Sequence, residues 1–355
     1  MKELRLMKGN EAIAEAAIRA GADAYFGYPI TPQSEIMEHL ADQNPVETTG
    51  MVVLQAESEV AVINMVYGAA CAGRRVMTSS SGPGISLMME GISYLSGSEL
   101  PCLIVNIARG GPGLGTIQPS QSDYFQATKG GGHGDYRMLV LAPSSVQEMA
   151  DFVRLGFDLA FKYRNPVMML SDGVIGQMME KVELPEFQPC KKENESWATI
   201  GKTSDRERNI ITSLNLDALK HERHNIKIQA KYRRMEEEDT RCETTFCDDA
   251  EYMVVAYGAS ARISRKAVEL AREQGIKAGL FRPITLFPFP AKELKTAAKN
   301  TKGLLSVEMN AGQMIEDVRL AVDCRIPVKH FGRYGGVIHA PEEILEAIKR
   351  YGNHQ

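Results

Sequence analysis

The chain has 355 residues, of which 44% are hydrophobic and 24% charged, and its formal net charge is −4. This length is enough for two domains with separate cores, and the composition is that of an ordinary globular protein. The slight negative charge and the lack of Lys/Arg runs argue against a nucleic-acid-binding surface. No apolar stretch reaches the about 18 residues that cross a membrane, and the N-terminal segment has no signal-peptide core, so a cytoplasmic protein is expected.

In chain order, the first 184 residues alternate between helical and strand-like segments after a short N-terminal strand. Helices are predicted over 10–19, from Thr31 onward, and over 58–72, 84–96, 120–128 and 144–163. Continuously apolar strands are predicted over 24–28, 51–55, 76–80, 103–107, 138–141 and 167–170. Such strands, separated by helices, indicate the α/β fold class, with a parallel sheet covered on both faces in a first domain at 1–184.

The composition changes over residues 185–248. Runs such as KKENES and KYRRMEEEDTR are charged and poor in strand formers, which is typical of a solvated helical linker. A second alternation begins at Tyr252, and a smaller α/β domain is therefore expected over 249–355. Its predicted strands are 253–257, 278–281 and 303–308, and its predicted helices are 260–274, 291–299 and 341–351.

Three loops that follow strands of the first domain have unusual sequences, namely YPITP (28–32), TSSSGPG (78–84) and IARGGPGLG (107–115). Any one of them is unremarkable as a turn. Because ligands bind beyond the carboxyl ends of parallel strands, the three together predict one shared site. RGGPGLG does not open directly into a helix, which argues against a dinucleotide-binding fingerprint.

Two charged side chains are candidates for chemistry at this site. The Arg109 guanidinium matches a carboxylate bidentately, although an ion pair at the surface or at an interface is an equally good interpretation. Glu57 and Glu59 begin an apolar helix, where negative charge is favourable. The two lie about 200° apart around the helix axis, so only one can point into the cleft. A carboxylate that points inward needs a partner.

Metal-binding patterns are weak in this sequence. The six cysteines include no C-x-x-C pair, so no metal cluster is expected in this chain. Asp172 lies in an S-D-G that resembles the start of a magnesium–diphosphate motif, but Asn194 follows too early to close it. His133, in KGGGHGDYR, is either a residue that acts on substrate or a hydrogen-bonded loop histidine. The cysteines are Cys71, Cys102, Cys190, Cys242, Cys247 and Cys324.

Motifs follow one another along nearly the whole chain. They are GNEAIAEAAIRAGADAYFGYPITPQSE, QAESE, SSSGPG, ARGGPG, GGGHGDY, GASARI and FRPITLFPFP. In this order and spacing they resemble the alpha subunit of 2-oxoacid:ferredoxin oxidoreductases. The run RGGPGLGTIQPSQSDYFQATKGGGHGDYR is most similar to the 3-methyl-2-oxobutanoate (2-ketoisovalerate) form. The 2-oxoglutarate form, a component of another thiamine enzyme and a non-catalytic scaffold subunit remain alternatives, and aryl 2-oxoacids remain open as substrates.

This resemblance implies a first domain that binds the aminopyrimidine ring of thiamine diphosphate and a second domain similar to the transketolase C-terminal domain. It implies that Thr31 lies beside substrate and cofactor and that Arg109 binds the 2-oxoacid carboxylate. Glu59 would hydrogen-bond the pyrimidine nitrogen and favour its imino tautomer. The implied cofactor-binding residues are Tyr28, Pro29, Ile30, Glu59, Ser81 and Gly82.

The resemblance also implies the reaction and its partners. A 2-oxoacid would lose CO₂, coenzyme A would take the acyl group, and the electrons would pass through [4Fe-4S] clusters to ferredoxin. Mg²⁺ and the clusters would lie in partner subunits, which are expected to be a thiamine-binding beta subunit, a gamma subunit and a ferredoxin-like delta subunit. No nucleic acid and no membrane partner is expected.

Overall fold

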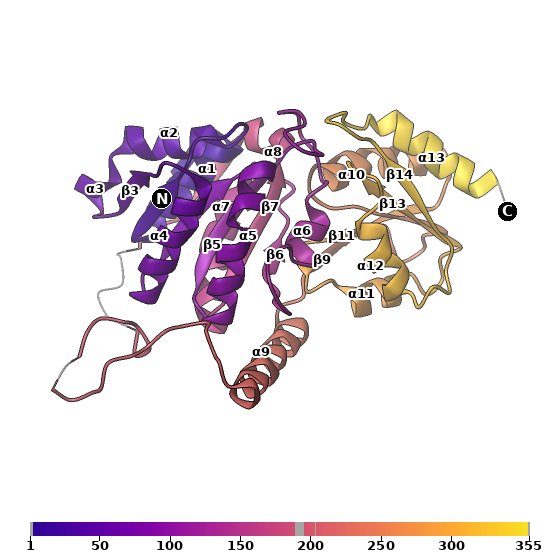
Figure 1. The fold of residues 1–355 in the computed structure, drawn as a ribbon. Coiled ribbons are helices and arrows are strands. Elements are labelled where there is room, and N and C mark those ends of the chain that lie inside the picture. The colour runs from indigo at the N-terminus through magenta and orange to yellow at the C-terminus, as the bar shows by residue number, and fades with distance from the viewer. Residues whose placement is uncertain (1–2, 189–194, 203, 354–355) are drawn as a thin grey trace.

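The computed structural model describes residues 3–188, 195–202 and 204–353, so Cys190 and Asn194 lie outside the described residues. The chain forms two α/β lobes that lie side by side, with the N-terminus in the first lobe and the C-terminus in the second (Figure 1). Each lobe is built around its own β-sheet, of seven strands in the first lobe and five in the second. The predicted α/β fold class is confirmed.

The seven-stranded sheet has the spatial order β12-β6-β7-β5-β4-β2-β3, and all of its strands are parallel except β12, which is antiparallel to β6. The six strands predicted from the first 184 residues are all present in it. The strands are β2 (Ala24–Gly27), β3 (Val52–Gln55), β4 (Val76–Ser80), β5 (Cys102–Ala108), β6 (Leu139–Leu141), β7 (Pro166–Asp172) and β12 (Thr285–Phe287).

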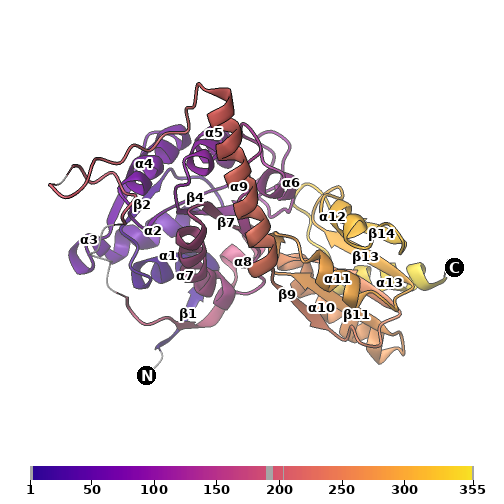
Figure 2. The same cartoon turned by 90° about the horizontal axis from the view of Figure 1, so that it is seen from below.

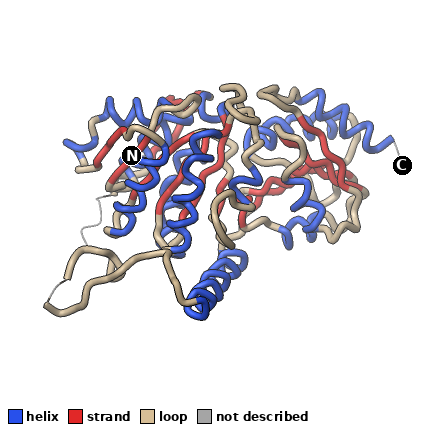
Figure 3. Tube along the Cα trace, in the orientation of Figure 1, coloured by secondary structure: helices blue, strands red, loops and turns tan. Residues whose placement is uncertain are grey.

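Helices cover both faces of this sheet (Figure 3). The helices α4 and α5 pack on one face, and α1 and α7 pack on the other. Every residue of β4, β5 and β7 is buried, as expected for strands covered on both faces. The helices of this lobe are α1 (Gly9–Arg19), α2 (Ser34–Gln43), α3 (Pro45–Thr48), α4 (Glu59–Cys71), α5 (Gly82–Gly97), α6 (Tyr124–Thr128), α7 (Val146–Tyr163) and α8 (Gly173–Gln177).

Two helix starts differ by three residues or more from the sequence-based prediction. The helix expected from Thr31 begins at Ser34. A proline disfavours helical backbone at the residue before it, here Thr31, and Pro32 itself has no N–H to donate. The segment 31–33 instead forms a turn, in which Gln33 N donates to Ile30 O at 3.1 Å. The helix expected over 120–128 begins only at Tyr124. Both corrections lengthen loops at the carboxyl ends of strands.

The five-stranded sheet has the spatial order β14-β13-β10-β11-β9, with only β9 antiparallel. The helices α10 and α13 pack together in this lobe, and so do α11 and α12. The strands are β9 (Cys242–Thr245), β10 (Tyr252–Val255), β11 (Ala278–Pro283), β13 (Gly303–Glu308) and β14 (Val328–Gly332). The helices are α10 (Gly258–Glu273), α11 (Ala291–Ala297), α12 (Met314–Ala321) and α13 (Pro341–Asn353).

Within the described residues of the segment expected to be a charged helical linker, the only helix is α9 (Ala218–Glu238). Seen from below, α9 lies across the first lobe (Figure 2), where His224 Nε2 is 2.7 Å from Gly97 O and Lys231 Nζ donates to Arg164 O at 3.2 Å. Residues 242–245 form β9 of the second sheet, and β12 extends the first sheet. The domain boundaries at 184 and 249 stay a prediction.

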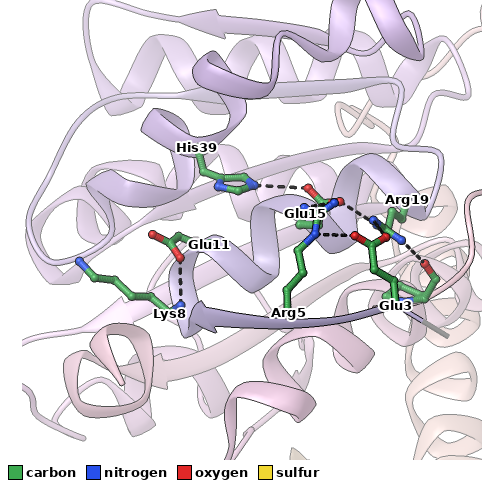
Figure 4. Close-up of polar contacts among 8 residues, drawn as sticks. Glu3, Arg5, Lys8, Glu11, Glu15, Arg19 and His39 are labelled. Carbon is green, nitrogen blue, oxygen red and sulfur yellow. Dashed lines mark hydrogen bonds and ion pairs between the residues drawn. The ribbon is translucent and has the colours of Figure 1, made fainter. Parts of the chain in front are cut away.

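A partly buried ion cluster joins α1 to the antiparallel ribbon of β1 (Glu3–Lys8) and β8 (Met179–Leu184), through the ion pairs of Arg19 with Glu3 and of Glu15 with Arg5 (Figure 4). Arg19 Nε donates to Glu15 Oε1 at 2.7 Å, and His39 Nε2 lies 3.4 Å from Glu15 Oε2. Burial alone would raise the pKa of Glu15, but the bonds from His39 and Arg19 outweigh it and lower this pKa from 4.5 to about 2.

We predict that Glu15→Gln lowers the free energy of unfolding near pH 7 by about 3 kcal/mol, since each pKa unit corresponds to about 1.4 kcal/mol. A carboxyl whose pKa is depressed on folding stabilises the fold above its unfolded pKa. The deficit of Glu15→Gln should therefore shrink as the pH falls from 4.5 towards about 2. Urea unfolding at several pH values measures it, with the exposed Glu38→Gln as control. A deficit that does not change with pH would contradict the prediction.

Candidate functional site

The carboxyl ends of β5, β4, β2 and β3 lie next to one another, because these four parallel strands are consecutive in the sheet. The loop after β2, the start of α4 after β3, the start of α5 after β4 and the loop after β5 all lie at this edge. The loops that the sequence analysis singled out therefore meet at one edge of one sheet.

The loop after β2 is held by buried polar side chains. Gln33, which is fully buried, accepts from Ser79 Oγ at 2.6 Å and donates from Nε2 to Tyr28 O at 3.1 Å. Asn10 Nδ2 donates to Pro32 O at 2.8 Å. These bonds fix the backbone of residues 28–32, in which Tyr28 and Ile30 are half-buried and Pro29 and Thr31 are exposed. Gln33 was not predicted from the sequence, where its only signal is a polar residue at the expected helix start.

Arg109 follows β5 and reaches the loop after β2. Its Nη1 donates to Thr31 O at 2.9 Å, and its Nη2 donates to Leu114 O at 3.2 Å. A Cβ built on Gly82 would lie 3.6 Å from Arg109 Cγ. Thr31, Gly82 and Arg109 are thus brought together. Among the described residues no carboxylate forms an ion pair with Arg109, and its Nε has no hydrogen-bond partner.

Glu59 is the first residue of α4, and it is buried, whereas Glu57 is exposed. Ser58 caps the helix by accepting from Ala61 N at 3.2 Å. A Cβ built on Gly84 would come within 2.7 Å of Glu59 Oε1 and 2.1 Å of Ser80 Oγ. The carboxylate of Glu59 therefore lies against the first turn of α5, and only a glycine at position 84 leaves room for it.

Three hydroxyl groups in the last part of β4 and directly after it have no hydrogen-bond partner within the described part of the chain. They belong to Thr78, Ser80 and Ser81, which are all buried. Unpaired polar groups in a protein interior are rare and need an explanation. Ser80 Oγ and Glu59 Oε1 lie close together, because both would be within 2.7 Å of a Cβ built on Gly84. With the neighbouring hydroxyls of Thr78 and Ser81 they form a polar cluster at the end of β4, which suits a bound molecule with hydrogen-bonding groups.

A cavity of about 780 Å³ opens beside Arg109 between the two lobes. Asp123 lines it and, although it stands at the N-cap position of α6, it makes no capping bond and accepts instead from Asn106 Nδ2 at 3.0 Å. Burial raises the pKa of Asp123, against the bond from Asn106 and the charge of Arg109. Nothing in the sequence analysis pointed to Asp123.

Gln121 forms several hydrogen bonds with the second lobe beside this cavity. Its Nε2 donates to Tyr257 O at 2.9 Å, and its Oε1 accepts from Ser260 Oγ at 2.8 Å and from Met309 N at 3.0 Å. Its backbone N donates to Met309 O at 3.0 Å, and its backbone O accepts from Asn310 Nδ2 at 2.8 Å. These bonds place residues 309–313 of the second lobe on the cavity.

Two candidates from the sequence lie elsewhere. His133 is exposed in a loop that lines a different cavity, of about 510 Å³. This cavity lies beside α9 and the C-terminal half of α5. Asp172 Oδ1 caps α8 by accepting from Val174 N at 2.8 Å. Burial raises the pKa of Asp172 to about 6 in spite of its backbone bonds. The geometry of Asp172 is that of a helix cap.

Within the described ranges, five cysteines are free thiols, and Cys190 lies outside those ranges. The same residues contain no group of three or more His, Cys, Asp or Glu side chains placed to hold a metal ion. None of the described helices is both long enough and apolar enough to cross a membrane.

Comparison with known proteins identifies the family. The thiamine-diphosphate-binding domain of pyruvate flavodoxin/ferredoxin oxidoreductases matches residues 15–242, and core domain II of pyruvate:ferredoxin oxidoreductase matches residues 250–344. The chain is 52% identical to the ketoisovalerate oxidoreductase subunit VorB of Methanothermobacter thermautotrophicus, over 97% of each chain. It is 38% identical to the 2-oxoglutarate synthase subunit KorA of the same organism, over 98% of this chain and 99% of that subunit.

A solved structure agrees with these matches. The 2-oxoglutarate:ferredoxin oxidoreductase from Magnetococcus marinus, solved with 2-oxoglutarate, coenzyme A and succinyl-CoA bound, superposes with a TM-score of 0.87 at 29% identity, over 98% of this chain and 65% of that chain. The resemblance drawn from the sequence motifs and the predicted enzyme class are confirmed. The chain belongs to the pyruvate flavodoxin/ferredoxin oxidoreductases that bind thiamine diphosphate, and it is a subunit of a 2-oxoacid:ferredoxin oxidoreductase.

Proposed function

We propose that this chain is the alpha subunit of an enzyme that oxidatively decarboxylates 3-methyl-2-oxobutanoate to an acyl-CoA and CO₂ and reduces ferredoxin. The observation that carries the proposal is the 52% identity, over 97% of both chains, to a subunit named for ketoisovalerate, against 38% to a subunit named for 2-oxoglutarate. Arg109, the only basic side chain among the described residues that line the cavity, also suits a substrate with one carboxylate.

The polar cluster around Glu59 has hydrogen-bonding groups of the kind that thiamine diphosphate would need from this chain. A buried carboxylate and unpaired hydroxyls, including that of Ser81, suit a ring with several nitrogen atoms. When bound, thiamine diphosphate supplies the electron sink for loss of CO₂ from a 2-oxoacid. The residues proposed to hold it are Tyr28, Pro29, Ile30, Glu59, Ser81 and Gly82.

Three residues of this chain have proposed roles in the reaction. Glu59 would share a proton with the pyrimidine nitrogen, because a buried carboxylate strengthens a hydrogen bond to a basic nitrogen. Arg109 would hold the substrate carboxylate and orient the 2-oxo group. Thr31, whose carbonyl binds the same guanidinium, would lie beside both substrate and cofactor and would help to fix their relative position.

We further propose that this subunit acts in the cytoplasm with beta, gamma and ferredoxin-like delta subunits. Mg²⁺ and the [4Fe-4S] clusters would lie in those partners, and ferredoxin and coenzyme A would be the acceptors. The names of the similar proteins support the assembly, since both VorB and KorA are named as subunits of an enzyme.

Arg109→Lys should lower kcat/KM for 3-methyl-2-oxobutanoate by roughly 10²-fold in the assembled enzyme, because lysine keeps the charge but loses the planar fork. Affinity for thiamine diphosphate should hardly change. Viologen reduction measures the first quantity, and calorimetric titration of the cofactor measures the second. An equal loss of cofactor binding would make Arg109 a structural residue.

Gly84→Ala should weaken cofactor binding by about tenfold or more, because the new methyl group would displace the Glu59 carboxylate, which lies 2.7 Å from its position. The matched control is Gly68→Ala in α4, where a Cβ meets no atom within 4 Å. Calorimetric titration of the assembled enzyme with thiamine diphosphate compares the two, and thermal melting checks that both fold. Unchanged affinity in Gly84→Ala would argue that Glu59 does not contact the cofactor.

Glu59→Gln should slow proton–deuterium exchange at C2 of bound thiamine diphosphate by roughly 10²–10⁴-fold. The amide keeps the size of the side chain but has no carboxyl group to share a proton with the pyrimidine nitrogen. Stability should not fall, since a neutral amide is cheaper to bury than a carboxylate. The matched control is the exposed Glu57→Gln, which should be nearly silent. Near-normal exchange in Glu59→Gln, or a larger loss in Glu57→Gln, would overturn the assignment.

A further inference from the structure

The second lobe supplies part of the cavity beside Arg109. The walls from the first lobe are the first two turns of α5 and the loop after β5. The walls from the second lobe are residues 309–313, after β13, and Tyr334 with Gly335, after β14. A molecule held by Arg109 in this cavity therefore faces side chains of a domain that the sequence analysis did not connect with substrate.

The loop that carries Tyr334 packs closely against the loop after β5. A Cβ built on Gly110 would lie 3.2 Å from the carbonyl carbon of Gly335, and a Cβ built on Gly336 would lie 2.3 Å from Gln118 Cβ. Gly335 and Gly336 have φ of 62° and 95°, a left-handed backbone that favours glycine. The two loops run side by side at the top of the molecule (Figure 1).

Tyr334 is held from its other side as well. Arg333 forms an ion pair with Glu343 of α13. The preceding strand β14 pairs with β13 over its whole length, from Val328 to Gly332. The aromatic side chain is thus placed on the cavity by a backbone that is fixed at both ends, although Tyr334 itself is 60% exposed.

The chemistry of the cavity wall selects the ligand. Of the described residues that line it, Arg109 is the only basic one and Asp123 the only acidic one. A 2-oxoacid has one carboxylate for Arg109, whereas a second carboxylate would find no second cation and would face the charge of Asp123. Pro83, Leu87 and Tyr334 add apolar surface. An apolar group of the ligand that covers this exposed aromatic and aliphatic surface removes apolar area from water, which strengthens binding.

We propose that Tyr334 is a specificity-determining residue, whose ring contacts the side chain of the 2-oxoacid and favours branched, apolar, uncharged side chains. The inference rests on the proposed function, because it concerns the substrate of that same site. It assigns the second lobe a part in substrate selection, through one aromatic side chain on a loop that both lobes hold in place.

The test uses the assembled enzyme, with 3-methyl-2-oxobutanoate, pyruvate and 2-oxoglutarate as substrates and viologen reduction as the assay. Tyr334→Ala should lower kcat/KM for 3-methyl-2-oxobutanoate by about tenfold, mainly through KM, and should change that for pyruvate by less than about twofold, because pyruvate lacks the branched group. Tyr334→Phe should restore the preference. The matched control is Ile338→Ala, a partly exposed apolar residue outside the lining of the cavity, which should leave the substrate ratio unchanged.

Two results would overturn this inference without affecting the proposed function. One is an equal loss for the branched substrate and for pyruvate in Tyr334→Ala. The other is weaker subunit assembly on size-exclusion chromatography with an unchanged substrate ratio, which would make Tyr334 an interface residue. The proposed function fails in a different way, because the unaltered enzyme would then use none of the three 2-oxoacids or would prefer 2-oxoglutarate, and the inference would fall with it.

Discussion

The cavity between the lobes depends on one buried side chain, Gln121. Both ends of its amide and both of its backbone polar groups are bonded to the second lobe, so no part of the residue is free to turn. A buried polar network of this kind is rigid when every member is paired and costly when one is removed. Asp123 lines the cavity only two residues after Gln121, so the contacts that fix Gln121 also restrain this part of the cavity wall. The shape of the cavity therefore depends on an interdomain contact and not on either sheet alone.

A second buried group holds the other side of that contact. Glu308, the last residue of β13, is fully buried and accepts from Met314 N at 2.7 Å and from Ile315 N at 3.0 Å. Its carboxylate thus caps α12 across an intervening turn, where negative charge is stabilised by the free N–H groups of the helix. The turn between them, residues 309–313, is short and has little freedom. Its two ends are tied, one to Gln121 and the other to Glu308, and this is how the second lobe can present a defined wall to a ligand held by the first.

The sequence predicted the features that repeat locally and missed those that join distant segments. Six apolar parallel strands and the meeting of three strand-end loops follow from local periodicity and from the rule that parallel strands end at one edge. The edge strand β12 was missed because it has three residues in a proline-rich stretch, and its partner β6 lies far away in sequence. Gln121 and Asp123 carry no pattern of their own, since a polar residue in a loop has many uses. The residues alone did not decide between Glu57 and Glu59, because helical spacing separates the two but does not say which one points inward. The family resemblance implied Glu59, and Glu59 is the buried one of the two in the structure.

The division of the site between the lobes also bears on how substrates are distinguished. The residues proposed to hold the cofactor lie in the loop after β2 and at the starts of α4 and α5, all in the first lobe. The proposed specificity residue, Tyr334, lies in a loop of the second lobe, where an exposed position tolerates substitution better than a buried one such as Glu59. A change of side chain at position 334 alters the cavity wall without touching Glu59, because the two lie on different elements. If Tyr334 meets the substrate as proposed, selection of the 2-oxoacid can vary on one lobe while the residues proposed for the chemistry common to all 2-oxoacids stay unchanged on the other.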